Sequence, residues 1–295
     1  MLLCAHWSLR SYRDIAVATI DHRLRKAARA EAETVGRWAR DLGYAHHLLT
    51  WEEEKPATRL QERARQARYA LLAACARRIG ASAVVVAHHA DDQAETILFR
   101  LTRGSGIAGL AGMARIARCE EFALLRPLLD FRKAELEAIC ARAGQAFFRD
   151  PSNEDDNFAR ARLRKLAPVL AAQGFSQEAL LRLGARASRA DAALTQCAAE
   201  TLQRAWRKDD AACVELDAAT LCAAPPEILQ RALASAILRL APAATLRLER
   251  LERASARIGD ALTARKSVKT TLADISIEAS DGRVRLRRAP PRRSS

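Results

Sequence analysis

Most of the chemistry that this sequence suggests lies in one short run of acidic and imidazole side chains, residues 88–95 (HHADDQAE). If a helix begins near Asp91, then Asp92 and Glu95 lie three residues apart and share one helical face. Two carboxylates on one face can hold an ammonium group or accept a proton from it. Asp91, at the amino end, can cap free backbone N–H groups. A structural interpretation, with Asp91 only a cap and Glu95 only a surface charge, stays open, but the paired histidines at the strand end favour a functional site.

The elements around this run place it at the edge of a sheet. Residues 82–87 (SAVVVA) predict a buried strand, so the polar run follows its carboxyl end, where open α/β sheets bind their ligands. Upstream, apolar runs at 15–20 and 45–50 alternate with helical stretches at 28–42 and 59–78. This alternation predicts βαβ units and a parallel sheet.

The pattern becomes mainly helical beyond residue 150. Before it, residues 103–113 are glycine-rich, 122–125 predict a strand and 132–143 a helix. The later helices are predicted at 155–172, 177–207, 226–240 and 246–262, and short strands at 268–272, 275–279 and 283–286. We therefore expect an α/β fold, a Rossmann-like parallel-sheet domain over residues 1–170 followed by a smaller, mainly helical domain over 171–286, with a basic disordered tail at 287–295.

The charge of the chain is strongly positive and comes mostly from arginine. The 49 Lys and Arg residues outnumber the 35 Asp and Glu residues, for a net charge of +14. Arginine suits bidentate contact with phosphate, so this charge suggests a polyanionic partner. A composition rich in alanine and arginine also arises from a GC-rich genome, so the charge alone does not decide the partner.

Composition also excludes some classes of protein. No segment reaches the run of about eighteen apolar residues that a membrane span needs, and the start lacks a secretory cleavage pattern, so we expect a cytoplasmic protein without a membrane partner. The seven cysteines are scattered without a C-x-x-C pair, which favours reduced thiols over a zinc site or a disulfide framework. They are Cys4, Cys75, Cys119, Cys140, Cys197, Cys213 and Cys222.

The longer string that begins at His88, HHADDQAETILFRLTRGSGIAGLAGM, resembles the signature of the tRNA(Ile)-lysidine synthetases, a branch of the PP-loop ATPases that modify tRNA. Order and spacing agree with this family from about residue 14 to residue 170. The other matching segments are 20–25 (IDHRLR, like V-D-H-x-L-R), 60–69 (LQERARQARY, like a helix ending in A-R-x-x-R-Y), 126–129 (RPLL) and 150–155 (DPSNED) with the arginines that follow.

The resemblance implies a reaction in two steps. ATP transfers AMP to an oxygen of the wobble cytidine in a tRNA(Ile) with a CAU anticodon, and free L-lysine then displaces AMP. The lysine amine, with an ordinary pKa near ~10.4, must lose a proton before it attacks. Asp92 and Glu95 are therefore the candidate ligands and bases, and His88 could steady the adenylate or the ring. The implied small partners are ATP and Mg²⁺, the latter without a dedicated protein metal site, and a homodimer is left open.

Further binding residues come from the same resemblance. Glycine allows an anion to approach the backbone closely at 103–106, and arginines can offset phosphate charge or follow a tRNA backbone. For each single arginine a solvated helix face is the competing interpretation. The nucleotide or substrate contacts are assigned to Asp21, His22, Asp91, Arg65, Arg68, Arg103, Gly104 and Gly106, and the tRNA contacts to Arg160, Arg162 and Arg164.

One family segment is not found among the 295 residues. Family members open with a strand and an S-G-G-x-D-S loop whose N–H groups cradle the pyrophosphate end of ATP. Residues 1–10 (MLLCAHWSLR) resemble the end of the helix that follows this loop, and a sheet without that strand would expose its neighbours' edges. Three hypotheses follow: an active synthetase whose amino end lies upstream, a tRNA- or nucleotide-binding remnant without catalysis, or another PP-loop tRNA modifier such as a thiolase. The lack of paired cysteines argues against the thiolase.

Overall fold

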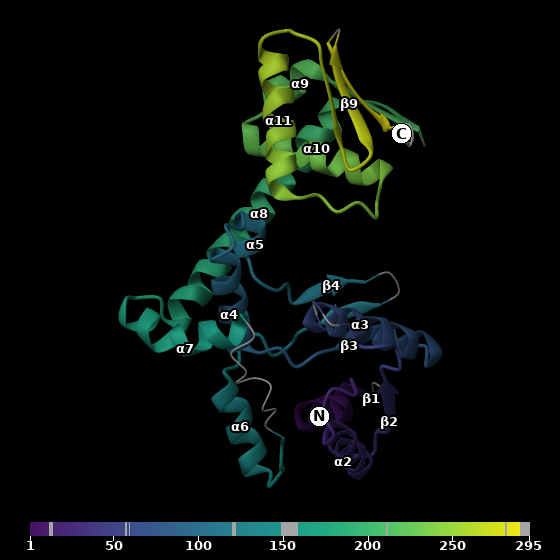
Figure 1. Cartoon of the computed structure of the whole chain (residues 1–295), viewed down its shortest axis with the longest axis vertical. Helices are drawn as coiled ribbons and strands as arrows, with labels where there is room; N and C mark the ends of the chain where they lie inside the picture. Colours follow the sequence, from purple (N-terminus) through teal and green to yellow (C-terminus); the bar gives the residue numbers. More distant parts are fainter. Residues whose placement is uncertain are drawn as a thin grey trace. The chain divides into compact units, whose positions relative to one another are not determined.

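The computed structural model of the chain describes residues 1–11, 14–56, 58, 60–119, 122–148, 159–210, 212–280 and 282–289. The chain divides into two compact units (Figure 1). The first unit consists of Met1–Phe99 and Gly112–Leu181, and the second unit of Arg100–Ala111 and Arg182–Ser295.

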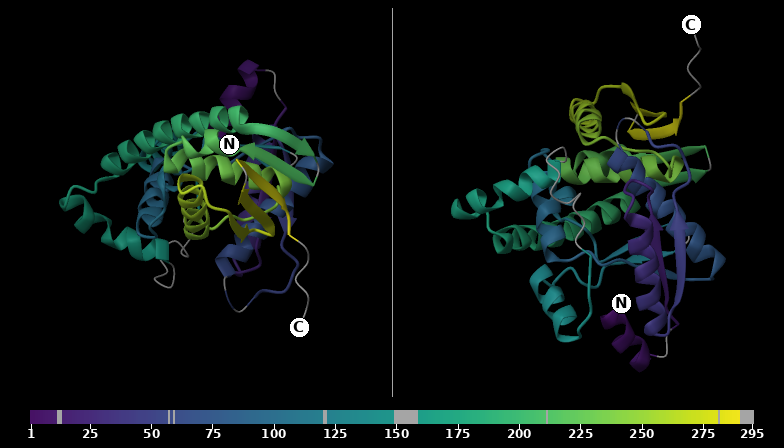
Figure 2. Two further views of the ribbon diagram at one scale, coloured as in Figure 1. Left: turned by 90° about the horizontal axis from the view of Figure 1, so that it is seen from above. Right: turned by 60° about the horizontal axis from the view of Figure 1, so that its bottom comes forward.

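The first unit contains a βαβ motif near the start of the chain. Strands β1 (Ala16–Asp21) and β2 (Ala45–Thr50) pair in parallel, with Asp21 opposite Thr50. Helix α2 (Ala28–Asp41) connects them and packs against both strands (Figure 2). The chain leaves this helix through Gly43, whose φ of +78° is a conformation that glycine adopts without strain. These elements agree closely with the βαβ unit predicted from the sequence.

A second, three-stranded sheet belongs to the same unit. Its order is β3 (Ala83–Val85), β5 (Ala123–Leu125) and β4 (Ile116–Arg118), with β5 parallel to β3 and antiparallel to β4. Helix α3 (Leu60–Arg78) runs from β2 to β3 and contacts strands of both sheets. Within the described residues the strands of this unit form two sheets, and each contains a parallel pair, β1 with β2 and β3 with β5, which agrees with the parallel-sheet fold expected from the sequence. Strand β4 was not predicted.

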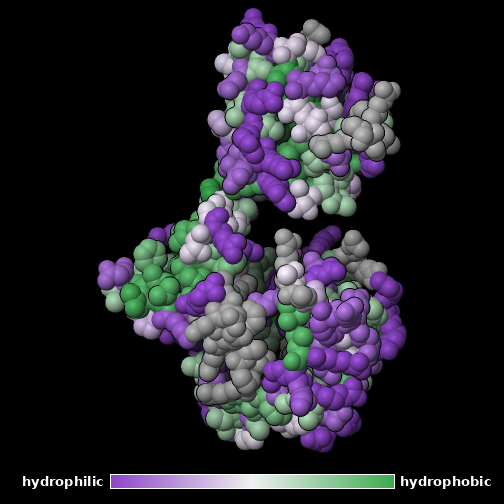
Figure 3. Space-filling model, in the orientation of Figure 1, coloured by the Kyte–Doolittle hydropathy of each residue, from purple (hydrophilic) through white to green (hydrophobic). Residues whose placement is uncertain are grey.

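The remaining helices of the first unit surround these sheets. Helix α4 (Ala90–Leu101) starts in this unit and buries Ile97 completely. Helix α7 (Ala159–Ala172) is much less buried, since Leu166 is 50% and Val169 63% exposed. Figure 3 shows hydrophobic surface over this helix. The other two are α1 (Leu2–Ser11) and α6 (Lys133–Arg142).

The second unit combines helices with a five-stranded antiparallel sheet. The strand order is β6 (Trp206–Asp210), β7 (Cys213–Asp217), β10 (Arg283–Arg288), β9 (Ile275–Ser280) and β8 (Val268–Leu272). The helices are α5 (Ile107–Leu110), most of α8 (Gln177–Ala205), α9 (Ala218–Cys222), α10 (Pro226–Leu240) and α11 (Leu248–Thr263). The alternate residues Val284 and Leu286 are fully buried in the core between sheet and helices.

Two boundaries in this unit differ from the sequence-based prediction. Helix α8 ends at Ala205 rather than at residue 207, because Trp206 already pairs with Leu216 of β7. Arg287 and Arg288, assigned to a disordered tail, extend β10 and pair with β9. The prediction was wrong at these two arginines because exposed charges can alternate with buried residues on a half-buried strand. Residues 290–295 lie outside the described part of the chain.

The core of the second unit offers a test of its packing. Ile258 of α11 is fully buried among the strands and helices, so Ile258→Ala should lower the free energy of unfolding by about 2–5 kcal/mol through lost contacts and a cavity. The exposed neighbour Arg257 serves as the control, since Arg257→Ala should change stability by less than about 0.5 kcal/mol. Urea denaturation followed by circular dichroism measures both, and equal effects of the two changes would contradict the assigned core.

Candidate active site

A cavity of about 430 Å³ in the first unit is lined by both β1 and β3. These strands are end strands of their two sheets, and the described residues leave each with a partner on one side only. The cavity size suits a small molecule, and part of its wall lies at the carboxyl end of β1, where α/β sheets bind ligands. Its lining residues are Ala18, Thr19, Ile20, His22, Arg68, Tyr69, Leu72, Val84, Val85, Val86, Ala87 and His88.

Two histidines of the cavity wall each have a buried ring nitrogen without a hydrogen bond among the described residues. The Nδ1 atoms of His22 and His88 are buried and, among the described residues, make no hydrogen bond. Burial lowers the pKa of both imidazoles; nearby Arg68 lowers that of His22 further, whereas Asp92 partly offsets the effect at His88. Buried polar atoms are nearly always satisfied in a working protein. The pair therefore indicates a polar ligand that meets neutral imidazoles in the cavity.

These lowered pKa values predict a dependence of stability on pH. An unfolded histidine takes up a proton near pH ~6.5, whereas the folded His88 resists protonation, so stability is fully present above that pH and is lost as pH falls through the lower, folded value. His88→Gln should therefore make the loss of unfolding free energy between pH ~7.5 and ~5.5 smaller. The control is His6→Gln on the exposed face of α1. Denaturant titrations at both pH values would contradict this account if His88→Gln left the loss unchanged.

The two aspartates at the start of α4 both accept backbone hydrogen bonds. The N–H of His89, just before the helix, donates to Asp92 Oδ2 at 3.0 Å, so Asp92 is the residue that caps α4. Asp91 was expected to cap its own helix, but its Oδ2 accepts the N–H of Lys133, the first residue of α6, at 2.8 Å. The His89 ring lies between them, 3.3 Å from Asp91 and 3.5 Å from Asp92.

Glu95 lies one turn further along α4 and is bound by an arginine of α7. Arg164 Nη2 donates to Glu95 Oε2 at 2.9 Å, and Arg164 Nε donates to the other carboxylate oxygen. The side chain of Glu95 is 19% exposed and that of Arg164 38%. The structure thus brings together a predicted lysine ligand and a predicted tRNA contact that are far apart in sequence.

The other predicted residues are distributed over both units. Arg65 lies over the Tyr69 ring at 5.0 Å, and Arg68 Nη2 lies 3.4 Å from His22 Nε2. Asp21, 4% exposed, accepts the N–H of Arg23 at 2.8 Å, so its role in the structure is local. Arg162 is exposed on α7, and the side chain of Arg160 lies outside the described part of the chain. Arg103, Gly104 and Gly106 fall in the second unit rather than with Asp92 and Glu95.

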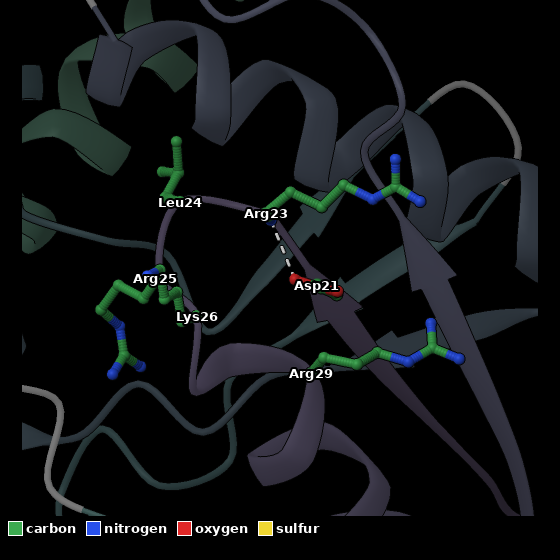
Figure 4. A pocket seen from close by; sticks show the side chains of 6 residues that line it. All are labelled: Asp21, Arg23, Leu24, Arg25, Lys26 and Arg29. Atoms are coloured by element: carbon green, nitrogen blue, oxygen red, sulfur yellow. Dashed lines mark hydrogen bonds between the residues drawn. The ribbon is translucent and has the colours of Figure 1, made fainter.

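A second cavity, of about 600 Å³, follows β1 directly (Figure 4). Its wall is rich in cationic residues, but each of its arginines forms an ion pair with a glutamate, at distances of 2.7 to 2.9 Å. Most of its positive charge is therefore compensated, which makes it a weaker anion site than its lining suggests. The lining residues are Asp21, Arg23, Leu24, Arg25, Lys26 and Arg29, and the ion pairs are Arg23–Glu52, Arg25–Glu31 and Arg29–Glu33.

Two residues near the site were not selected from the sequence. Arg126 is 6% exposed and donates to the Ala114 carbonyl at 2.7 Å, and its charge contributes to the lowered pKa of His88. Its buried Nε makes no hydrogen bond within the described residues. The Gln93 side chain accepts the Met113 N–H through Oε1 at 2.7 Å and donates from Nε2 to the Met113 carbonyl at 3.0 Å. The signal for Arg126 was a charged residue directly after an apolar strand.

The described residues contain no group of three histidine, cysteine or acidic side chains that could hold a metal ion. None of the described helices combines the length and the apolar character that a membrane crossing requires.

Comparison with known proteins places these observations in a family context. A family model described as a PP-loop domain matches residues 1–170. The tRNA(Ile)-lysidine synthase of Methylobacterium sp. (strain 4-46) is 47% identical over 284 residues, which cover 95% of this chain and 82% of that protein. The synthase of the same name from Rhodopseudomonas palustris (strain ATCC BAA-98 / CGA009) is 53% identical over 196 residues, 66% of this chain and 57% of that protein.

A solved structure supports the fold. The U34-tRNA thiolase NcsA from Methanococcus maripaludis, determined with its [4Fe-4S] cluster, superposes with a TM-score of 0.50 over 62% of this chain and 67% of that one. Its sequence identity is 10%, so the likeness concerns the fold alone.

Proposed function

Because this chain belongs to the tRNA(Ile)-lysidine synthase family of PP-loop proteins, we propose that it adenylates the wobble cytidine of tRNA(Ile) and then joins free L-lysine to that cytidine. The observation that carries the residue assignment is local. The wall of a cavity includes two imidazoles whose Nδ1 atoms make no hydrogen bond among the described residues, and one of them, His88, lies two residues before the helix that carries Asp92 and Glu95. A cavity wall that leads directly into the helix with these carboxylates suits a reaction that uses ATP and an amine.

The first step takes place at the cavity. The exocyclic carbonyl oxygen on the cytosine ring attacks the α-phosphorus of ATP, a bond from this oxygen to phosphorus forms, and the bond from phosphorus to pyrophosphate breaks as pyrophosphate leaves. His22, Arg68 and Tyr69 line the space proposed for the nucleotide, where an imidazole or an aromatic ring can contact the base and a guanidinium can contact phosphate. The neutral His88 donates a hydrogen bond to the adenylate or accepts one from it. The buried cation Arg126 lies close enough to lower the pKa of His88.

The second step uses the carboxylates of α4. Asp92 and Glu95 bind the lysine ammonium and one of them takes its proton, so that the neutral amine attacks the activated ring carbon. A carbon–nitrogen bond forms as the bond to the AMP oxygen breaks. The backbone bond from His89 keeps Asp92 at the helix start, which fixes one of the two carboxylates.

Mg²⁺ is assigned to ATP rather than to a protein cage. This ion keeps several waters and usually takes one or two carboxylates plus substrate phosphates. When bound, it would neutralise phosphate charge. The exposed Arg162 is a proposed phosphate contact of the tRNA, and the turn with Arg103, Gly104 and Gly106 is a proposed phosphate contact of the nucleotide or substrate. We also propose that the reaction takes place in the cytoplasm.

The adenylation step can be tested without lysine. ATP labelled at the α-phosphate should label tRNA(Ile) with a CAU anticodon, and lysine should then release labelled AMP. A tRNA whose wobble cytidine is replaced by guanosine serves as the control and should stay unlabelled. Absence of label from the tRNA with the wobble cytidine would contradict the proposal.

A further inference from the structure

Glu95, one of the two carboxylates proposed to bind the ammonium group of free lysine, already binds a cationic side chain of the protein. Arg164 contacts both oxygens of Glu95. The hydrogen bond to Glu95 raises the pKa of Arg164, and the charges of Asp92 and Asp91 act in the same direction. The guanidinium therefore lies within the field of all three carboxylates, where the lysine ammonium is expected.

Glu95 differs from its two acidic neighbours in what it binds. Asp91 and Asp92 each accept a backbone N–H, of Lys133 and His89 respectively, so part of their role is structural. Among the described residues, the Glu95 carboxylate accepts hydrogen bonds from the Arg164 side chain and from no other side chain or backbone group. The guanidinium takes one acceptor site on each Glu95 oxygen, so a lysine ammonium reaches this face of the carboxylate only when the guanidinium leaves it.

Helix α7, which carries Arg164, is lightly packed. From Arg162 to Ala172 no residue of this helix is fully buried, and Leu166 and Val169 are 50% and 63% exposed. Segments with few buried apolar contacts open at low free-energy cost. Arg164 can therefore move away from Glu95 without disrupting the core around Ile97.

We propose that Arg164 occupies the lysine site of the RNA-free protein and leaves it when an RNA phosphate takes over its guanidinium. The planar guanidinium binds carboxylate and phosphate with the same two-point geometry, so the exchange replaces one bidentate partner with another. Lysine then binds well only after tRNA. This inference rests on the proposed function, and Arg164 acts in it as a positioning residue through Glu95.

Equilibrium dialysis of radiolabelled L-lysine tests this exchange directly, because it measures binding in the absence of ATP and therefore without turnover. Saturating tRNA(Ile) with a CAU anticodon should raise lysine affinity at least about tenfold, within the usual range of coupling between sites. Arg164→Met should bind lysine equally with and without tRNA, near the affinity of the tRNA-bound parent. Arg164→Lys should keep part of the coupling. The control Arg142→Met, at an exposed arginine of α6 that is not assigned to RNA, should keep all of it.

The outcomes separate three accounts. If the parent and both Arg164 variants bind lysine equally with and without tRNA, the exchange is wrong while lysine binding itself stands. Circular dichroism checks that Arg164→Met and Arg164→Lys are folded. If both folded variants bind lysine more weakly than the RNA-free parent, then Arg164 has a permanent structural contact with Glu95 and the exchange is also wrong. Absence of lysine binding by every form in the presence of tRNA would overturn the lysine assignment of Glu95 and with it the proposed function.

Discussion

Asp92→Asn is expected to slow lysine transfer to tRNA by about 10²- to 10⁴-fold, the usual contribution of a positioned general base. Asparagine retains an oxygen that can accept the His89 N–H, so the cap of α4 should survive. The change removes only the negative charge that binds the ammonium and can accept its proton. The measurement is the rate of radiolabelled lysine incorporation, with tRNA affinity measured in parallel by filter binding.

The matched control for this variant is Asp130→Asn. Asp130 is 70% exposed in the same unit and pairs with Arg115, so its charge should not affect lysine transfer. Asp92→Asn should leave tRNA affinity within about twofold of the parent, because one charge outside the RNA contacts contributes little to it. A large loss of tRNA affinity in Asp92→Asn would contradict the role assigned to this carboxylate.

Affinity for tRNA is expected to fall about 10³-fold or more between ~50 and ~200 mM salt, as it does for proteins that contact many phosphates. The net charge of +14 supplies the long-range attraction, and arginine supplies the contacts. In a plot of log affinity against log salt, Arg162→Gln should reduce the slope by about one, the share of one phosphate contact. Filter binding at four salt concentrations measures both quantities.

The control for the salt experiment is Arg142→Gln on α6. Arg142 is exposed in the same unit, like Arg162, but was not assigned to RNA. Its replacement should leave the slope unchanged. Equal slopes for all three proteins would contradict the assignment of Arg162, and a weak salt dependence of the parent would contradict phosphate contact as the main source of affinity.

The sequence predicted those elements whose signals are local. The bounds of β2, β8 and α10 match, because apolar periodicity and the turn or proline residues beside them act over a few neighbouring positions. Gly43 and Gly80 end their helices with φ of +78° and +67°, as expected for C-terminal caps. Strands β4, β6 and β7 were not predicted, because their stability depends on pairing partners distant in the sequence.

The candidate site was predictable in its residue types but not in its contacts. The position of α4 after a strand placed Asp92 and Glu95 correctly on one helix. That Asp91 binds the start of α6, and that Arg164 binds Glu95, depends on chain segments 42 and 69 residues away. No local pattern encodes such contacts. The resemblance to a family supplied the choice of residues, and the structure supplied their partners.

The most direct test of the central claim is ATP-dependent incorporation of radiolabelled lysine into tRNA(Ile) with a CAU anticodon. We expect incorporation to require ATP and the wobble cytidine, and to fall to background in Glu95→Gln. Incorporation with these requirements would support a lysidine synthase, whereas no incorporation, with tRNA still bound, would contradict that function and leave an RNA-binding protein.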